Sequence, residues 1–514
     1  MKSVQDLSLD VSSLPLEQHG VKRSQQILSF LDSTLDSWVV YPKFFPVTAQ
    51  ARYPELMSST GAAVVPVPRK QVISWALWDW GTSAFSVLIT TFVFARYIVS
   101  SYFIDPKIVA AYEAAGGEGV ATGPALANFQ AAEANLTSWV GWALAIGGVA
   151  VAAIAPVVGQ RTDAGGKRKL WLGINTGIVI AATAAMFFVE GTPQFFALGI
   201  VLLTIGNVFY EMANVNYNAM LLQVSTPKNM GRVSGFGWGM GYFGGIVVLL
   251  IALVGFILGD PPYWFGVTTD GGMNIRVVAV FGALWALAFS LPVLFNVPEN
   301  IATHPGKKAG IIESYKILFR KIADLYKNSR PTFYFLLASA VFRDGLAAVF
   351  AFGGILAGTV FGLSFTEVIL FAIGGNLVAG IGVLFSGWID DKIGSKRVIV
   401  IALIGLVLTG IGLFIFHDGG ATAFWIGGLM LTFFVGPAQA SARAFLGHLA
   451  PEGEEGEIFG LYATTGRAVS FLAPTLFAIF VSAFGATYFG ILGIVIVLLA
   501  GLLLMIPLRA KFIR

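Results

Sequence analysis

Long apolar segments recur along most of this chain, and they restrict its possible folds more than any other feature. Each reaches about 20 residues, the length that a helix needs to cross the hydrocarbon core of a bilayer. Of the 514 residues, 56% are hydrophobic and only 12% are charged, whereas a soluble domain has about 25% charged residues. Within lipid, the backbone polar groups of such a segment must bond to one another, which favours helices. The sequence therefore predicts an all-α polytopic membrane protein rather than a soluble domain with an unusually apolar core.

Twelve candidate membrane spans follow one another from Val72 onward. A polar extension, 1–69, comes before them, and a basic cytoplasmic linker, 299–330, separates the sixth span from the seventh. The expected organisation is thus two six-helix halves, 70–298 and 331–514, joined by that linker. The spans are expected at 72–99, 136–158, 170–189, 194–222, 235–258, 276–298, 331–358, 366–387, 397–416, 421–442, 457–483 and 487–508.

The N-terminal extension, 1–69, is polar and rich in proline. It has no apolar run directly behind a basic start, which argues against a cleaved signal peptide. Apolar residues recur at helical spacing within 24–40, so this stretch is either an amphipathic helix on the bilayer or against the cytoplasmic loops, or part of a disordered tail. The extension is also where a protein partner would bind.

Basic residues are concentrated in alternate connecting loops. Lys and Arg occur in the segments 159–169, 299–330 and 387–397, whereas 100–135 and 259–275 are mostly acidic. Cytoplasmic loops carry the excess of Lys and Arg in membrane proteins. The basic loops are therefore expected in the cytoplasm, and an even number of spans places both termini there too. The net charge of +4 reflects this topology and not nucleic-acid binding, because the basic residues are spread over short loops.

One charged motif occurs twice in the chain. The copy at 159–169 lies between the second and third spans, and the copy at 387–397 lies between the eighth and ninth. Both have a Gly, an Asp four residues later, another Gly after three more, and then a basic cluster, which indicates a duplicated six-helix unit. The matching positions are Gly159 and Gly387, Asp163 and Asp391, Gly166 and Gly394, Arg168 and Lys396, and Lys169 and Arg397.

Two six-helix halves related by an axis along the membrane normal are typical of major facilitator transporters. The two charged motifs resemble the signature of that superfamily between helices two and three, in which an Asp and basic residues brace the cytoplasmic side of one conformation. Residues 75–85 resemble the first-helix pattern W-x-L-Y-D-W-A-N-S-A-F of its vacuole-effluxer-like branch, with departures at Trp78 and at Gly81 and Thr82, beside Asp79. Further similar stretches are 217–221, 231–234, 241–245, 436–439, 459–460 and Pro474.

That branch includes the autophagy-related vacuolar amino-acid effluxers and their bacterial relatives. The resemblance covers the chain from Arg69 to the last span. It implies a secondary transporter that moves amino acids or similar small zwitterions by alternating access, with protons as the expected coupling ion. A sugar or a lysolipid is the alternative solute. A non-transporting receptor or assembly factor on the same fold, and a passive channel, are the alternative classes.

Signals for an enzyme or a pump are weak. The chain has no cysteine, which excludes thiolate metal sites and Cys nucleophiles, and its four histidines are scattered without the spacing of metal ligands. No phosphate-binding loop of the form G-x-x-x-x-G-K-[ST] is present, so nothing supports ATP-driven pumping. We expect no cofactor and no metal. The expected partners are the bilayer, a small-molecule substrate and protons.

Polar and ionisable residues inside the spans mark the candidate substrate or proton pathway, since each charge costs roughly 2.5–3.5 kcal/mol in hydrocarbon. Asp79 begins a polar stripe on the first span. On the fourth, Asn207, Glu211, Asn214 and Asn218 share one helical face, with Tyr210 beside it. Glu211 is the candidate proton carrier because burial disfavours a charged carboxylate. The alternative for both spans is a static network of hydrogen bonds between helices.

Cations occur inside two further spans. Arg343 and Asp344 adjoin each other in the seventh span and point about 100° apart, so they are not expected to neutralise each other directly. Arg467 lies in the eleventh span. Because a guanidinium matches a carboxylate geometrically, Arg343 or Arg467 is expected to bind the carboxylate of a substrate, or else to pair with Asp79, Glu211 or Asp344.

The last group of candidates lies at the cytoplasmic side of the tenth span. Gln439, a further candidate for the substrate or proton pathway, and Arg443 are near its end, and the acidic segment 452–457 follows. This segment is expected on the same side as the two charged motifs. Salt bridges between them would close the cytoplasmic side in one conformation, which makes the motif residues candidate gating residues. The alternative is a simply solvated loop.

Overall fold

The computed structural model describes residues 67–117, 120–299, 311–363, 365–451 and 454–508. Within these ranges the chain is helical, with irregular connections between the helices. This agrees with the all-α prediction. The amphipathic helix expected within 24–40 lies outside the described residues.

Twelve segments of the described chain are long and apolar enough to cross a membrane. They confirm the twelve predicted spans, and their ends differ from the prediction by a few residues; the tenth continues furthest, to Leu449. We call the first six the N-terminal half and the last six the C-terminal half. The segments are Arg69–Ile98, Trp139–Thr162, Arg168–Phe188, Pro193–Val224, Met230–Phe256, Asp270–Asn296, Arg330–Gly358, Leu370–Ile393, Ser395–Ile415, His417–Leu449, Glu455–Phe484 and Thr487–Met505.

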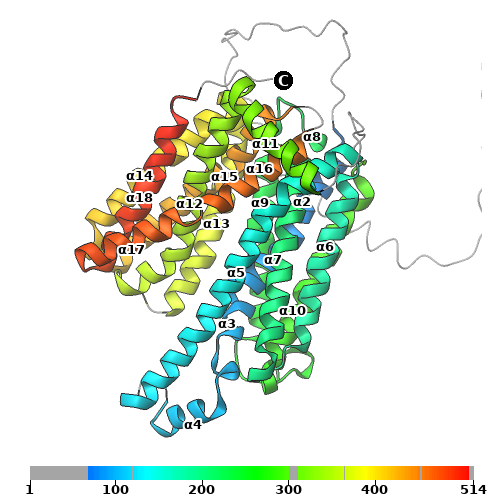
Figure 1. Cartoon of the computed structure of the whole chain (residues 1–514). Helices are drawn as coiled ribbons and strands as arrows, with labels where there is room; N and C mark the ends of the chain where they lie inside the picture. Colours follow the sequence, from blue (N-terminus) through cyan, green and yellow to red (C-terminus); the bar gives the residue numbers. More distant parts are fainter. Residues whose placement is uncertain (1–66, 118–119, 300–310, 364, 452–453, 509–514) are drawn as a thin grey trace, which may run out of the picture. The chain divides into compact units, whose positions relative to one another are not determined.

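Figure 1 labels the helices that make up these segments. The N-terminal half contains α2 (Arg69–Ala84), α3 (Phe94–Ile98), α4 (Pro106–Ala114), α5 (Gly123–Gly165), α6 (Arg168–Ala185), α7 (Phe196–Ala219), α8 (Leu221–Val224), α9 (Met230–Phe256) and α10 (Met273–Asn296). The C-terminal half follows α11 (Ile311–Asn328) and contains α12 (Arg330–Thr359), α13 (Phe365–Ile393), α14 (Ser395–Ile415), α15 (Gly420–Leu449), α16 (Glu455–Val469), α17 (Leu472–Phe484) and α18 (Gly490–Met505).

The first membrane segment is irregular in its second part. Between α2 and α3, the stretch Phe85–Phe92 is a π-helix. Two neighbouring hydroxyls, those of Thr90 and Thr91, both donate to the carbonyl oxygen of Ser86, at 2.7 and 2.8 Å. Threonine hydroxyls that bond back to the preceding turn compete with the helical backbone bonds, and π-helical turns are frequent at functional sites.

The two charged motifs are largely helical, although the sequence placed them in loops. Residues 159–165 continue α5 and residues 387–393 continue α13. The chain turns only at the second glycine of each motif, where Gly166 has a φ of 59° and Gly394 a φ of 88°. A residue without a Cβ adopts a positive φ at little cost, so these two glycines set the directions in which α6 and α14 begin.

Helices of opposite halves pack together near the two motifs. Helix α9 lies along α13, and α5 lies along α16. The backbones approach closely because small residues line both crossings: a Cβ on Gly159 would collide with the carbonyl oxygen of Gly456, and Gly387 faces the carbonyl oxygen of Gly231. We call the end of the helices that carries the two motifs the basic end.

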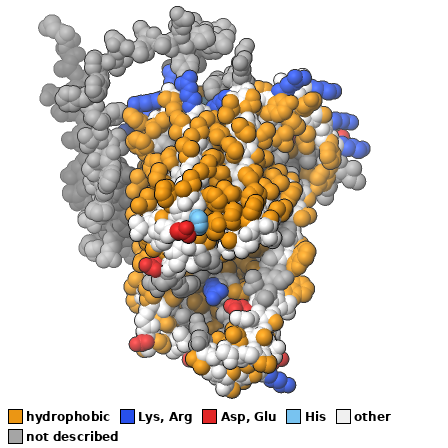
Figure 2. Space-filling view, turned by 90° about the vertical axis from the view of Figure 1, so that its left-hand side faces the viewer, with side chains coloured by type: hydrophobic (Ala, Val, Ile, Leu, Met, Phe, Trp, Pro, Cys, Tyr) orange, Lys and Arg blue, Asp and Glu red, His pale blue; other side chains and the backbone are white. Residues whose placement is uncertain are grey.

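The surface supports a membrane location for these helices. Figure 2 shows Lys and Arg side chains gathered at one end, above a wide band of hydrophobic side chains. On α14, for example, Ile401, Leu408 and Ile415 are exposed and recur every seven residues. An apolar stripe exposed on this scale is unfavourable in water but favourable against lipid tails.

Candidate functional site

The polar stripe predicted on the fourth span lies on α7, and part of it reaches the other half. Asn218 accepts a hydrogen bond from Arg443 of α15 through its Oδ1, at 3.1 Å. Asn214 instead donates to the carbonyl oxygen of Tyr210 in its own helix, at 3.0 Å. Asn207 is half-buried on the same helix. The stripe is therefore divided between contacts inside α7 and contacts that join the two halves.

Glu211 and Arg467 form an ion pair between the halves. The distance between Arg467 Nη2 and Glu211 Oε1 is 2.5 Å, and the two side chains are 35% and 26% exposed. Arg467 lies about 18 Å along α16 from its start at Glu455, which is near the middle of a hydrocarbon core about 30 Å thick. The pairing is one of the alternatives that the sequence left open. It places two opposite charges, both partly exposed, at mid-membrane depth.

Arg443 of α15 is buried among residues of the N-terminal half. Its side chain donates three hydrogen bonds there: to the carbonyl oxygen of Ser234 at 2.6 Å, to Ser234 Oγ at 3.0 Å and to Asn218 Oδ1 at 3.1 Å. Ser234 Oγ in turn donates to the carbonyl oxygen of Ala440, at 2.7 Å. A guanidinium has five donors in a rigid fork, and three of them here join α15 to α7 and α9.

Arg443 is also the cation that pairs with Asp79. Arg443 Nη1 lies 3.9 Å from Asp79 Oδ2, and the Tyr217 hydroxyl donates to that oxygen at 3.3 Å. The guanidinium carbon is also 5.0 Å from the centre of the Trp75 ring and 5.6 Å from that of Trp238. Charge, hydrogen bonds and aromatic faces thus all hold the cation.

The sequence did not predict that Arg443 pairs with Asp79. It placed Arg443 only near the cytoplasmic end of the tenth span, and it offered Arg343 and Arg467 as partners of Asp79. The available signal was the spacing of Gln439 and Arg443, which places them on one face of α15. That face meets the N-terminal half, because Tyr242 of α9 donates to Gln439 Oε1 at 3.3 Å.

Arg343 and Asp344 point to different partners, as predicted. Arg343 donates to the carbonyl oxygen of Tyr462 at 3.0 Å, and its guanidinium carbon lies 4.0 Å from the centre of the Tyr462 ring. Asp344 accepts a hydrogen bond from the backbone N–H of Ala473 at 2.6 Å. That N–H is the second of α17, so the carboxylate satisfies a donor at a helix N-terminus. Both contacts lie within the C-terminal half.

At the basic end, each charged motif contacts the opposite half. Arg168 Nη2 lies 2.6 Å from Glu455 Oε2, and the two side chains are only 2% and 7% exposed. Asp391 accepts from the backbone N–H of Arg232 at 3.0 Å and pairs with its Nε at 3.2 Å. Glu455 begins α16, and Arg232 lies in the first turn of α9. Each motif therefore holds the start of a span of the opposite half, the first motif through its Arg168 and the second through its Asp391.

Other basic residues of the motifs bond within their own half or lie at the surface. Lys169 Nζ donates to the carbonyl oxygen of Val297 at 3.1 Å, and Lys396 Nζ donates to that of Ile506 at 2.7 Å. Each bond ties a motif to the end of the last span of the same half. Arg397 is exposed. The side chain of Asp163 lies outside what the structure describes.

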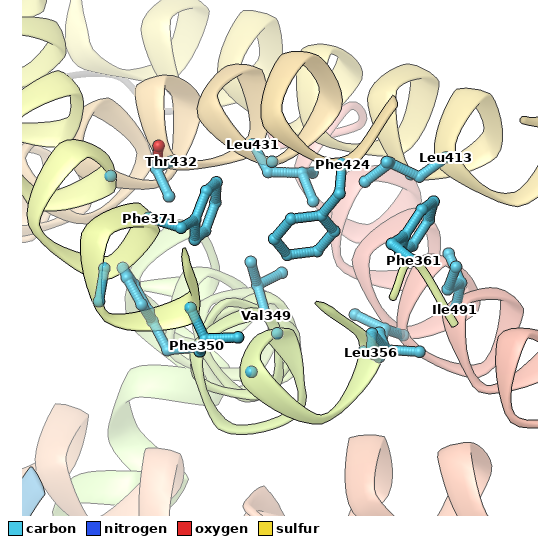
Figure 3. A pocket seen from close by; sticks show the side chains of 18 of the residues that line it. Val349, Phe350, Leu356, Phe361, Phe371, Leu413, Phe424, Leu431, Thr432 and Ile491 are labelled. Carbon is cyan, nitrogen blue, oxygen red and sulfur yellow. The ribbon is translucent and has the colours of Figure 1, made fainter. Parts of the chain in front are cut away.

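The structure also contains an apolar cavity of about 210 Å³, lined mainly by the C-terminal half and also by Thr91 and Phe92 of the first membrane segment. None of the predicted site residues lines it. Its two polar side chains on α13 and α15 bond to their own helices: Asn376 donates to the carbonyl oxygen of Ala372 at 2.8 Å, and Thr432 to that of Leu429 at 2.9 Å. A third polar side chain, Thr91, donates to the carbonyl oxygen of Ser86. The rest of the wall is apolar and includes Val349, Phe371, Leu413, Phe424 and Ile491 (Figure 3). This lining does not suit a charged solute.

Comparison with known proteins gives the family of this chain. A family model described as "Vacuole effluxer Atg22 like" matches residues 67–511. The chain is 23% identical over 437 residues to the uncharacterized MFS-type transporter YxiO of Bacillus subtilis, a match that covers 85% of this chain and 94% of that protein. It is 25% identical over 288 residues to autophagy-related protein 22-1 of Aspergillus fumigatus, which covers 51% of this chain and 45% of that protein.

Solved structures give the fold. The proton:xylose symporter XylE is similar with a TM-score of 0.61 and 12% identity, over 85% of this chain and 94% of that one. The fucose:proton symporter FucP of E. coli has a TM-score of 0.63 and 10% identity, over 86% of this chain and 98% of that one. At such low identities the similarity shows only the major facilitator fold.

Proposed function

This chain belongs to the family of Atg22-like vacuole effluxers and has the major facilitator fold, so it is a membrane transporter and not an enzyme, and we propose that it moves amino acids or similar small zwitterions by proton-coupled alternating access. The solute class follows the resemblance to vacuolar effluxers, whose family model the chain matches. The choice of protons as the coupling ion is supported by the two proton symporters with the same fold. The basic end faces the cytoplasm in this proposal, as the positive-inside rule requires.

The observation that carries the proposal is the ion pair between Glu211 and Arg467. A zwitterion has one carboxylate and one ammonium group. The Arg467 guanidinium matches the carboxylate, with two parallel hydrogen bonds, and the Glu211 carboxylate matches the ammonium. Because the pair joins α7 to α16 and is only partly buried, a substrate that takes the place of each partner replaces a bond between the halves. Binding is thereby linked to the relative movement of the halves.

Protons act on the same pair. A proton on Glu211 removes its negative charge and weakens its hold on Arg467, which frees the guanidinium for the carboxylate of the substrate. Proton binding and substrate binding then depend on one another at a single site. Asp79 is a second acidic group in the pathway, held by Arg443 across the same boundary between the halves.

The test is transport by the Glu211→Gln variant in proteoliposomes. Glutamine keeps the size and the hydrogen-bonding ability of the side chain but cannot carry the charge or release a proton. We expect uptake of a labelled amino-acid mixture to lose its dependence on the pH gradient, while the melting temperature stays near that of the wild type. Glu113→Gln, on the exposed face of α4, is the matched control and should transport normally. Full gradient-driven uptake by Glu211→Gln would show that this residue does not carry the proton.

The solute class is tested separately by thermal stability. A ligand that binds the folded protein raises its melting temperature by mass action. We expect amino acids to stabilise the purified full chain, and sugars and lysolipids to have no effect. Stabilisation by a sugar or a lysolipid alone would contradict the assignment. In proteoliposomes, solute flux that does not depend on the pH gradient would instead favour a channel.

A further inference from the structure

A second cavity, of about 200 Å³, lies on the N-terminal half, near the basic end. It is formed by α5, α6 and α11, and none of the paired pathway charges lines it. Helix α11 is fixed there by Tyr315, whose hydroxyl donates to the carbonyl oxygen of Ala153 at 2.8 Å. The lining residues are Ile154, Val157, Val158, Arg161, Trp171 and Tyr315.

The lining is ordered by depth. Arg161 is the penultimate residue of the second membrane segment, Trp139–Thr162, and lies where lipid headgroups are expected. Ile154 comes two turns earlier on the same helix, about 10 Å deeper. It is 43% exposed, and Trp171, near the start of the third segment, is 39% exposed. Tryptophan is enriched at this level of membranes. A cation at the rim above an exposed apolar wall reproduces the order of phosphate and acyl chain in a phospholipid.

Helix α11 adds to the same pattern. Phe319 lies one turn beyond Tyr315 and is 68% exposed, which is unfavourable for an aromatic ring in water. Lys316 and Arg320 are exposed beside it. A helix with exposed aromatic and basic residues is typical of the membrane surface, where anionic lipids attract its charges.

Among the side chains that the structure describes around the cavity, basic groups outnumber acidic ones. Arg161 at the rim, Lys167 before α6, and Lys316 and Arg320 on α11 are all exposed. The acidic group on α11 in this region is Glu313, whose Oε2 lies 3.9 Å from Lys316 Nζ. An anionic ligand is therefore favoured over a zwitterionic or cationic one.

We infer that this cavity binds one anionic phospholipid of the surrounding bilayer, with its phosphate at Arg161 and an acyl chain against Ile154 and Val157. A small polar solute would leave most of the lining unused, because the wall below Arg161 is apolar. The lipid fills the space between α11, which connects the two halves, and the helices of the N-terminal half. This site is independent of the proposed transport chemistry, and its test does not use transport.

The experiment measures lipid retention by the full chain. The protein is placed in nanodiscs of phosphatidylcholine with phosphatidylglycerol at about one lipid in ten, which keeps the surface potential low. It is then released from the nanodiscs, and native mass spectrometry measures its mass with any bound lipid. We expect one phosphatidylglycerol to be retained in preference to phosphatidylcholine. Arg161→Gln should weaken this retention about fivefold, the effect of one basic residue at an anionic surface. Arg161→Lys should keep most of it.

Two further variants make the result decisive. Ile154→Trp fills the apolar part of the cavity and should reduce retention of the lipid without changing any charge. Lys228→Gln removes one exposed positive charge elsewhere at the basic end and should leave retention unchanged. Equal retention of the two lipids, or the same loss for Lys228→Gln as for Arg161→Gln, would overturn the inference, since only general attraction to the surface would then remain.

Discussion

Replacement of Arg443 by glutamine should open the basic end of the transporter. The guanidinium is 3% exposed, and the partners of its hydrogen bonds and ion pair belong to the opposite half. Removing one member of a buried ion pair costs about 3–5 kcal/mol. That cost applies only while the halves are closed, because in the open state both Arg443 and Asp79 are hydrated. At about 1.4 kcal/mol per factor of ten, the closed population should fall roughly a hundredfold or more relative to the open one.

The population can be measured with spin labels. The chain has no cysteine, so Lys228→Cys and Lys392→Cys introduce the two labelling sites without background. Both lysines are exposed at the basic end, one in each half. Pulsed dipolar spectroscopy should show a longer distance between the labels in Arg443→Gln than in the parent protein.

Two milder variants act as controls for this prediction. Asn218→Ala removes one acceptor of the guanidinium and should cost about 1.5–3 kcal/mol, the range for hydrogen bonds to charged groups, with a smaller shift in distance. Arg443→Lys keeps the charge but loses the fork, so it should lie between the parent and Arg443→Gln. An unchanged distance distribution in a folded Arg443→Gln protein would refute the idea that this cation holds the halves together.

Two other predictions concern charges outside that cluster. Arg168→Glu sets two carboxylates together where a buried ion pair now lies, so it should open the basic end, and a cysteine placed there should react with soluble thiol reagents. The double variant with Glu455→Arg should restore protection of that cysteine. No rescue would argue against a direct pair. In Asp344→Asn the amide oxygen can still accept the hydrogen bond from the N–H of Ala473. We therefore expect normal gradient-driven uptake and a loss of at most about 1 kcal/mol in stability. Loss of proton coupling would instead assign Asp344 to the pathway.

Much of the fold follows from local properties of the sequence. The apolar runs are as long as the bilayer is thick, so each span could be found from composition alone. The repeated motif gave the two halves for a similar reason, since both copies need a glycine where the chain turns between helices. The sequence did not reveal that the first part of each motif is helical. Residues 159–165 and 387–393 are polar enough to resemble a loop, but one face of each stretch, at Gly159 and Gly387, packs against the opposite half, and a helix satisfies the backbone there.

The candidate site was only partly predictable. Periodicity placed Glu211 and Asn218 on one face of α7, and both do contact the other half. It could not distinguish them from Asn214, which bonds to its own helix. The π-helical stretch in the first span was not predicted either. The hydroxyls of neighbouring threonines compete there with the backbone hydrogen bonds, and packing between helices decides the outcome.

The sequence thus determined which side chains carry charge inside the membrane and which helical face each of them occupies. The tertiary structure alone decided which charges meet: Arg467 with Glu211, Arg443 with Asp79, and Asp344 with the start of α17. The physical reason is that position along one helix fixes the direction of a side chain, whereas its partner depends on the register between helices that are far apart in the chain. For the two pairs that cross between the halves, close glycine contacts such as Gly159 with Gly456 and Gly387 with Gly231 set that register.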